Sequence, residues 1–227
     1  MESRRTEFQD TDDRSGHRAL SPARIAALCD GVFAIAMTIL VLGIAVPDAK
    51  TVPVEELPEA LRHLAPKVLV YVISFINLGV LWIGQHNQYH FIARTDRWFL
   101  WINIAYLLLI SFMPLSTALL GNYPLVRLAL FVYGANLLVA TLVLALHWHY
   151  ATAGGRLVAG RLPSGVVRIA HRRILGSAAA YALALLLSLL VPFAGLALFL
   201  AVPFVNILPF AVDRHLRHGS GGRDAGN

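Results

Sequence analysis

Six long apolar segments are the feature that most constrains how this chain can fold. A helix needs about 20 mainly apolar residues to cross the hydrocarbon core of a bilayer, which is about 30 Å thick. The six segments are close to that length, and polar, Pro-rich or Gly-rich sequence separates most of them. The sequence therefore predicts an all-α, polytopic membrane protein with six transmembrane helices. The expected spans are about 25–46, 68–89, 98–120, 125–149, 174–191 and 195–212.

The sequence outside these segments predicts short connections and two polar tails. The first connection is acidic, and its residues 55–63 can form a short surface helix. Residues 192–194 are barely long enough for a turn, so the last two spans should form a hairpin. No signal peptide is expected, because the polar N-terminus has no apolar core followed by a small-residue cleavage site. We expect residues 1–23 and 213–227 to be disordered and residues 24–212 to form one six-helix domain.

The composition agrees with a membrane protein and excludes several other classes. Hydrophobic residues make up 57% of the chain and charged residues only 14%, whereas soluble domains usually carry about a quarter charged residues. These values rule out a disordered chain and a disulfide scaffold, and they argue against a soluble enzyme. The single cysteine, Cys29, excludes an internal disulfide and a cysteine-based metal cluster. Abundant Arg and Ala, with Lys only at Lys50 and Lys67, are typical of a GC-rich bacterial genome.

The distribution of Lys and Arg predicts the orientation in the membrane. The net charge of +6 would suit nucleic acid or anionic lipid, but in a membrane protein it reflects the positive charge of cytoplasmic loops. Fifteen of the 19 Lys and Arg residues fall on one side of the predicted topology. We therefore expect cytoplasmic termini, a multi-pass location in the bacterial inner membrane, a lipid bilayer as partner and no nucleic acid.

The first apolar segment carries a one-sided pattern. At about 100° per residue, Ile35, Ile39 and Leu42 lie within about 60° of one another on one face of a helix. Thr38 lies at the edge of this stripe, whereas Asp30 falls about 140° away from Ile35. Taken alone, such a stripe is typical of ordinary packing inside one subunit.

Asp30 is an ionisable residue in an apolar segment, where a charge is costly unless it is paired or faces water. It either marks the cytoplasmic interface together with Arg24 or forms a buried polar anchor between helices. Arg24 is six residues away, about 240° around the helix, so the two cannot pair within one straight helix. Partners for a buried Asp30 must therefore come from other helices. The candidates in the same leaflet are His86, Asn103 and Arg97. We expect these three residues to form one structural polar network with Asp30 and Arg24.

Other residues near this leaflet give weaker signals. Trp82, Trp98 and Trp101 are typical of an interfacial aromatic belt. His86 and His90 stand four apart, as metal ligands can, but no carboxylate at helical spacing completes a site. The sequence contains no nucleophile elbow, P-loop, HExxH or dinucleotide fingerprint. We therefore predict no metal site, no cofactor and no enzymatic activity.

A proton-coupled secondary transporter of a small cation is the main alternative function at this stage. The intramembrane Asp30 would suit one, as would the prolines of the last span, Pro203 and Pro209, which can break a helix. Against this alternative, the chain contains no inverted repeat of the kind from which many transporters are built.

The run RIAALCDGVFAIA at residues 24–36 resembles the start of the transmembrane protein 175 potassium channel family. Members carry Arg-x-x-x-Phe-Ser-Asp followed by Gly-Val-Phe-Ala-Ile-Ala, and this chain has Leu28 and Cys29 where Phe and Ser are usual. The resemblance continues at Trp82 and His86, over residues 96–103, and over residues 114–124. The order of motifs covers most of residues 20–212.

The resemblance implies a potassium-permeable cation channel of the prokaryotic branch, with passive flux through a homotetramer. Four copies of the first helix would line a central pore, without the TVGYG filter of ordinary potassium channels. By position, Ile35 matches the constricting isoleucine of a hydrophobic gate, and Ile39 and Leu42 match further layers. Thr38 matches a hydroxyl position associated with ion preference. The permeating ion would be potassium.

Overall fold

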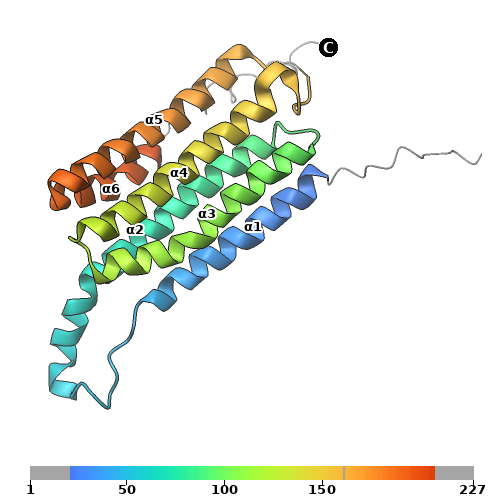
Figure 1. Cartoon of the computed structure of the whole chain (residues 1–227). Coiled ribbons are helices and arrows are strands. Elements are labelled where there is room, and N and C mark those ends of the chain that lie inside the picture. Colours follow the sequence, from blue (N-terminus) through green and yellow to red (C-terminus); the bar gives the residue numbers. More distant parts are fainter. Residues whose placement is uncertain (1–20, 161, 208–227) are drawn as a thin grey trace, which may run out of the picture.

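The computed structural model describes residues 21–160 and 162–207, in which six helices lie side by side as a bundle (Figure 1). The expectations for the two tails concern residues that fall almost wholly outside this part, as does the end of the sixth span with Pro209. Three short 3-10 helices, η1 (Leu40–Gly43), η2 (Val54–Glu56) and η3 (Ala153–Gly155), lie between the long ones. The α-helices are α1 (Pro22–Ile39), α2 (Leu57–Tyr89), α3 (Arg97–Asn122), α4 (Arg127–Thr152), α5 (Ser164–Leu190) and α6 (Pro192–Ile207).

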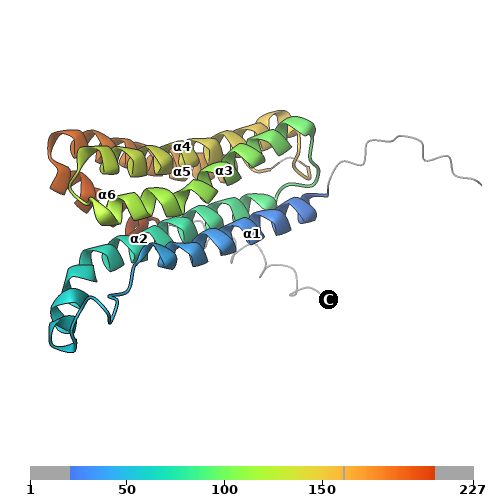
Figure 2. The same ribbon diagram turned by 60° about the horizontal axis from the view of Figure 1, so that its bottom comes forward.

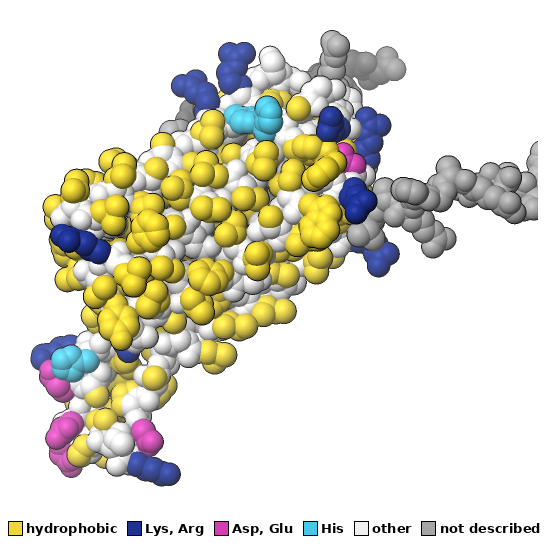
Figure 3. Space-filling model, viewed as in Figure 1, with side chains coloured by type: hydrophobic (Ala, Val, Ile, Leu, Met, Phe, Trp, Pro, Cys, Tyr) yellow, Lys and Arg dark blue, Asp and Glu magenta, His cyan; other side chains and the backbone are white. Residues whose placement is uncertain are grey.

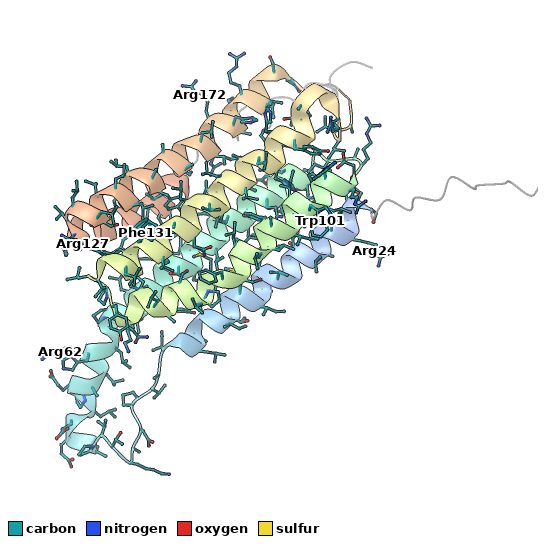
Figure 4. The ribbon with its side chains drawn as sticks, in the orientation of Figure 1. Arg24, Arg62, Trp101, Arg127, Phe131 and Arg172 are labelled. Atoms are coloured by element: carbon teal, nitrogen blue, oxygen red, sulfur yellow. The ribbon has the colours of Figure 1, made fainter. Side chains whose placement is uncertain are left out.

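The predicted all-α class and the six-helix plan are confirmed. Within the described residues, five helical segments are long and apolar enough to cross a membrane, and α6 is a shorter apolar helix. A long flank of the bundle is covered by hydrophobic side chains, and charged side chains collect at its ends (Figure 3). Arg24 and Arg172 lie at one end, and Arg62 lies toward the other (Figure 4).

Several helix bounds differ from those predicted. α2 begins at Leu57, so the expected surface helix and the second span are one helix with Pro66 inside it. α5 begins at Ser164 rather than near residue 174. Both extensions are polar, and a search for apolar runs finds only the part of a helix that lies in hydrocarbon. The first turns of α2 project beyond the other helices at the end opposite Arg24 (Figures 1 and 2).

The hairpin expected between the last two spans is present. α5 ends at Leu190 and α6 begins at Pro192, so a single residue separates them. The two helices pack closely, because Gly195 of α6 lies directly against the backbone and Cβ of Ser188.

Burial is distributed unequally among the helices. In its most apolar stretch, α4 has 56% of its residues buried, whereas α1 has only 28% and α5 only 22%. α4 is therefore the central helix, while α1 and α5 lie on opposite sides of the bundle (Figure 1). Most of the surface of α1 faces outward, toward lipid or toward another chain.

Candidate pore face and its polar anchor

The sequence of α1 separates a buried face from an exposed one. Every third or fourth residue points into the bundle, beginning with Ile25, Cys29 and Phe33 and continuing to Ala36. This spacing follows one side of an α-helix. Leu40, in the 3-10 turn η1, continues the buried face.

The opposite face of α1 carries the four residues that the sequence singles out for the pore. Ile35 is 60% exposed, Ile39 43% and Leu42 77%. Thr38 is exposed beside them. A single chain thus leaves a row of branched apolar side chains uncovered on one peripheral flank of the bundle.

The hydroxyl group of Thr38 donates its hydrogen bond within its own helix. It lies 3.0 Å from the carbonyl oxygen of Ala34 and 2.9 Å from that of Ile35, and it donates to one of them. Because its hydrogen is directed back at the helix, the oxygen presents lone pairs to the exposed side. This arrangement suits contact with a cation.

An apolar groove with a volume of about 550 Å³ runs beside this face, between α1 and α3. Ile35, Ile39 and Leu42 form its edge on α1. At one end of the groove the backbone at Gly43 lies close to α3. A Cβ added at Gly43 would be 3.4 Å from the Cβ of Ala118. The remaining lining residues are Val32, Ala36, Gly43, Ser111, Pro114 and Leu115.

Asp30 is exposed and is held by a residue of α2. The indole Nε1 of Trp82 donates a hydrogen bond of 2.8 Å to Oδ1 of Asp30. The ring of His86 packs on that of Trp82, with 5.1 Å between ring centroids. The acid of α1 is therefore fixed from another helix, by a tryptophan that the sequence suggested only as part of an interfacial belt.

Asn103 belongs to a separate, buried network centred on Cys29. Its Oδ1 accepts from Gln85 Nε2 at 2.8 Å, from the Tyr89 hydroxyl at 3.2 Å and from the Cys29 thiol at 3.4 Å. Gln85 Nε2 also lies 3.4 Å from the Cys29 sulfur. These contacts tie α1, α2 and α3 together at one level of the bundle.

The structure divides the five residues that were expected to form one network. Asp30 contacts Trp82, which packs on His86, whereas Asn103 contacts Cys29. Arg24 and Arg97 are exposed, and in the described part of the chain neither is hydrogen-bonded to Asp30 or Asn103. Cys29 takes the inward position because one residue turns a helix by about 100°.

Sequence reasoning missed Gln85 and Tyr89 as network members. Their signal is a pair of buried polar residues three positions apart in the apolar sequence of α2, Gln85 and Gln88, with Tyr89 directly after them. A second such pair, Ser74 and Asn77, lies further toward the start of α2, and the two residues bond the hydroxyl of Tyr133 of α4 at 3.1 and 3.2 Å.

His86 of α2 and His90, which directly follows this helix, stack edge to face, with 5.0 Å between their ring centroids. Among the residues that the structure describes, no group of three or more His, Cys, Asp or Glu side chains is placed to hold a metal ion.

Comparison with known proteins gives a consistent result. Residues 24–114 match the family model for the endosomal/lysosomal potassium channel TMEM175. The chain is 40% identical over 139 residues to a potassium channel of Chamaesiphon minutus. The aligned region covers 60% of this chain and 68% of that protein. It is 32% identical over 163 residues to a potassium channel of Streptomyces collinus, covering 68% and 76% of the two chains.

The fold is also similar to a solved structure. The crystal structure of a lysosomal potassium-selective channel TMEM175 homologue from Chamaesiphon minutus superimposes with a TM-score of 0.73 at 31% identity. The match covers 82% of this chain and 95% of that one.

Proposed function

Because this chain belongs to the TMEM175 family of potassium channels, we propose that it forms a potassium-permeable pore lined by four copies of α1. As a member of a channel family it is not an enzyme. The proposed pore conducts passively, in a bacterial inner membrane, with both termini in the cytoplasm. The sequence contains no TVGYG segment, so ion preference has to come from other groups.

The exposed face of α1 is the observation that carries this proposal. Ile35, Ile39 and Leu42 project from the side of the helix opposite its buried residues, on the flank of a bundle that leaves α1 largely uncovered. Four such faces around an axis give successive apolar rings. A ring of this kind blocks ions by excluding water, and widening or rotating the helices rehydrates it.

The roles of the pore residues follow from their order along α1. Ile35 forms the narrowest ring of the gate, and Ile39 and Leu42 form layers toward the outside. Thr38 lies between two of these layers and offers an oxygen to a partly dehydrated cation. The hydroxyl geometry supports this role, because the hydrogen is directed to the carbonyls of Ala34 and Ile35.

The polar contacts of α1 serve as its anchor. Trp82 fixes Asp30, and the network around Cys29 and Asn103 fixes the buried face. Asp30 points away from the gate, so the anchor sets the rotation of α1 without touching the permeating ion. Arg24 and Arg97 lie at the cytoplasmic end and help to fix the orientation of the chain in the membrane.

The projecting segment at the other end of the bundle carries acidic side chains that favour cations. Negative charge at a channel mouth raises the local cation concentration. Only Glu59 among these acids has a close ion pair within the described residues, with Arg62 at 2.7 Å. The acids are Asp48, Glu55, Glu56 and Glu59.

Ion flux through the purified protein in liposomes tests the proposal. An outward potassium gradient is compared with matched sodium and N-methylglucamine gradients, with and without a proton gradient. Passive flux that follows the electrochemical gradient is the expected result. Transport that requires a proton gradient would instead favour the alternative, a proton-coupled secondary transporter of a small cation.

The gate itself is tested by Ile35→Asn, which replaces an apolar ring by a polar one of similar size. We expect a higher leak current because the ring becomes wettable. Leu186→Asn is the matched control, since Leu186 is 61% exposed on α5, far from α1. Unchanged conductance in well-folded Ile35→Asn and Ile39→Asn tetramers would exclude α1 as the gate.

A further inference from the structure

The exposed side of α1 has two flanks of unequal size. At about 100° per residue, Ile35 and Leu42 point in nearly the same direction, which is the pore axis in the proposed channel. In a closed ring of four parallel helices, the two neighbours of each helix lie about 45° to either side of that axis. Each flank of α1 must therefore meet a different neighbour.

One flank is made of small side chains. Ala27, Gly31, Ala34 and Thr38 lie on this side at spacings of three and four, and all four residues are exposed. A Cβ added at Gly31 would meet nothing within 4 Å in the single chain. Small residues at this spacing let a second helix approach closely in a membrane.

The other flank is made of large side chains and borders the groove. Leu28 is 56% exposed there, and Ile39 follows on the same side. Beyond them, the groove opens toward Pro114 and Leu115 of α3. The hydroxyl of Ser111, the polar group in the groove, is bonded to the Leu107 carbonyl at 2.9 Å. The groove thus presents an almost entirely apolar surface.

We propose that the small flank of α1 in one copy packs against the large flank of α1, and into the α1–α3 groove, of the next copy. This inference rests on the proposed pore and names the surface that closes it. The contact is heterologous, so that each copy uses both flanks and the four copies of the proposed pore form a closed ring. Each Ile35 is then held in place by the neighbouring chain, and filling of the groove sets the width of the gate.

Small and large side chains lie at the same levels along α1, and this pairing supports a second copy of the chain, rather than lipid, as the occupant of the groove. A small residue stands beside a large one at each level, Ala27 beside Leu28 and Thr38 beside Ile39. Their directions differ by about 100°, close to the about 90° between the two neighbours in a ring of four. Lipid chains adapt to any apolar surface and need no such pairing.

Disulfide crosslinking tests the contact with the full-length protein. In a Cys29→Ser background, Ala27→Cys and Leu28→Cys are made singly and together, and the proteins are oxidised in membranes. We expect the double variant to give covalent dimers, trimers and tetramers, and each single variant to remain monomeric on denaturing gels. A mixture of the two single variants should give dimers only. Crosslinking of Ala27→Cys alone would overturn the proposal, because it indicates a two-fold contact between identical flanks.

A steric variant gives a second, independent measurement. Ala34→Leu fills the small flank, and we expect the folded protein to lose most of its tetramer, as measured by mass photometry in detergent. Ala179→Leu makes the same change at an exposed position of α5 and should leave the tetramer intact. Equal tetramer fractions in the two variants would overturn the inference.

The outcomes separate this inference from the proposed function. Tetramers that conduct potassium but show no crosslink between positions 27 and 28 would remove the head-to-tail contact and leave the α1 pore standing. Absence of both tetramers and passive flux in the unmodified protein would overturn the two together.

Discussion

The indole of Trp82 donates a hydrogen bond to Asp30 across 2.8 Å, and this contact joins the acid of α1 to α2. A carboxylate near hydrocarbon needs a donor, and α1 has none at helical spacing. The donor comes instead from a helix that packs deep in the bundle through its polar stripe. The rotation of α1, and with it the direction of Ile35, is therefore set by contacts on the other side of the helix.

Loss of the Trp82–Asp30 contact should damage assembly more than permeation. Trp82→Phe removes one charge-assisted bond, and we expect a loss of about 1 kcal/mol in stability. Asp30→Ala should lower the tetramer fraction further, while the surviving channels keep their potassium-to-sodium ratio. Size-exclusion chromatography after heating, followed by flux assays, measures both.

The control for this pair is Trp101→Phe, because Trp101 is 56% exposed and lies on α3 at the end of the bundle near Arg24 (Figure 4). Its stability should equal that of the unmodified protein. Intact Asp30→Ala tetramers with altered selectivity would contradict the assignment of Asp30 to the anchor.

The Asn103 network predicts a larger effect at a buried position. Asn103→Leu leaves the amide of Gln85 and the hydroxyl of Tyr89 without their shared acceptor, at a cost of about 1–3 kcal/mol. Thermal unfolding should show a clearly lower midpoint. The matched control is Asn87→Leu at an exposed position of α2, and an equal loss there would count against the network.

The same network gives an opposite prediction at Cys29. A hydroxyl is a better donor than a thiol, so Cys29→Ser should keep or raise the unfolding midpoint. Cys29→Val removes the donor and keeps an apolar side chain, and it should lower the midpoint. A Ser variant less stable than the Val variant would show that Cys29 acts by packing alone.

The apolar runs were sufficient to predict the bundle, because membrane thickness fixes the length of a span. They could not reveal that α2 begins at Leu57, since the polar turns before Pro66 leave the membrane and follow local helix preference. The interior partners of α1 were harder still. Asp30 and Cys29 are adjacent, and only the packing of α2 and α3 decides which of them meets Asn103.

The common face of the α1 pore residues was easier to predict than the contacts of the anchor. Ile35, Ile39 and Leu42 share one side of any regular helix, so their common face follows from spacing alone. The exposure of that face does not, because such a stripe is also typical of packing inside one subunit. Gln85 and Tyr89 depend on contacts across three helices, which no single-helix pattern contains.

The close contact between α5 and α6 predicts a strong effect at Gly195. An added methyl group would overlap Ser188, including its backbone, which cannot move aside as a flexible side chain can. Gly195→Ala should therefore destabilise the hairpin by about 1–3 kcal/mol. Gly176→Ala is the control, because a Cβ there meets nothing within 4 Å and Ala favours helix. Equal unfolding midpoints for the two variants would contradict the predicted clash.

Thr38 carries the last prediction, which concerns ion preference. Thr38→Val keeps the shape of the side chain and removes the oxygen that the exposed face presents, so a cation loses one ligand from each chain. We expect a lower potassium-to-sodium permeability ratio in liposome flux, whereas Thr38→Ser, which retains the oxygen, should stay close to the unmodified protein. Thr141→Val is the matched control, because the Thr141 hydroxyl makes the same kind of bond to a carbonyl of its own helix, at 2.8 Å from Leu137, but is buried in α4. A ratio that is unchanged in Thr38→Val, or lowered equally in Thr141→Val, would remove Thr38 from the conduction path.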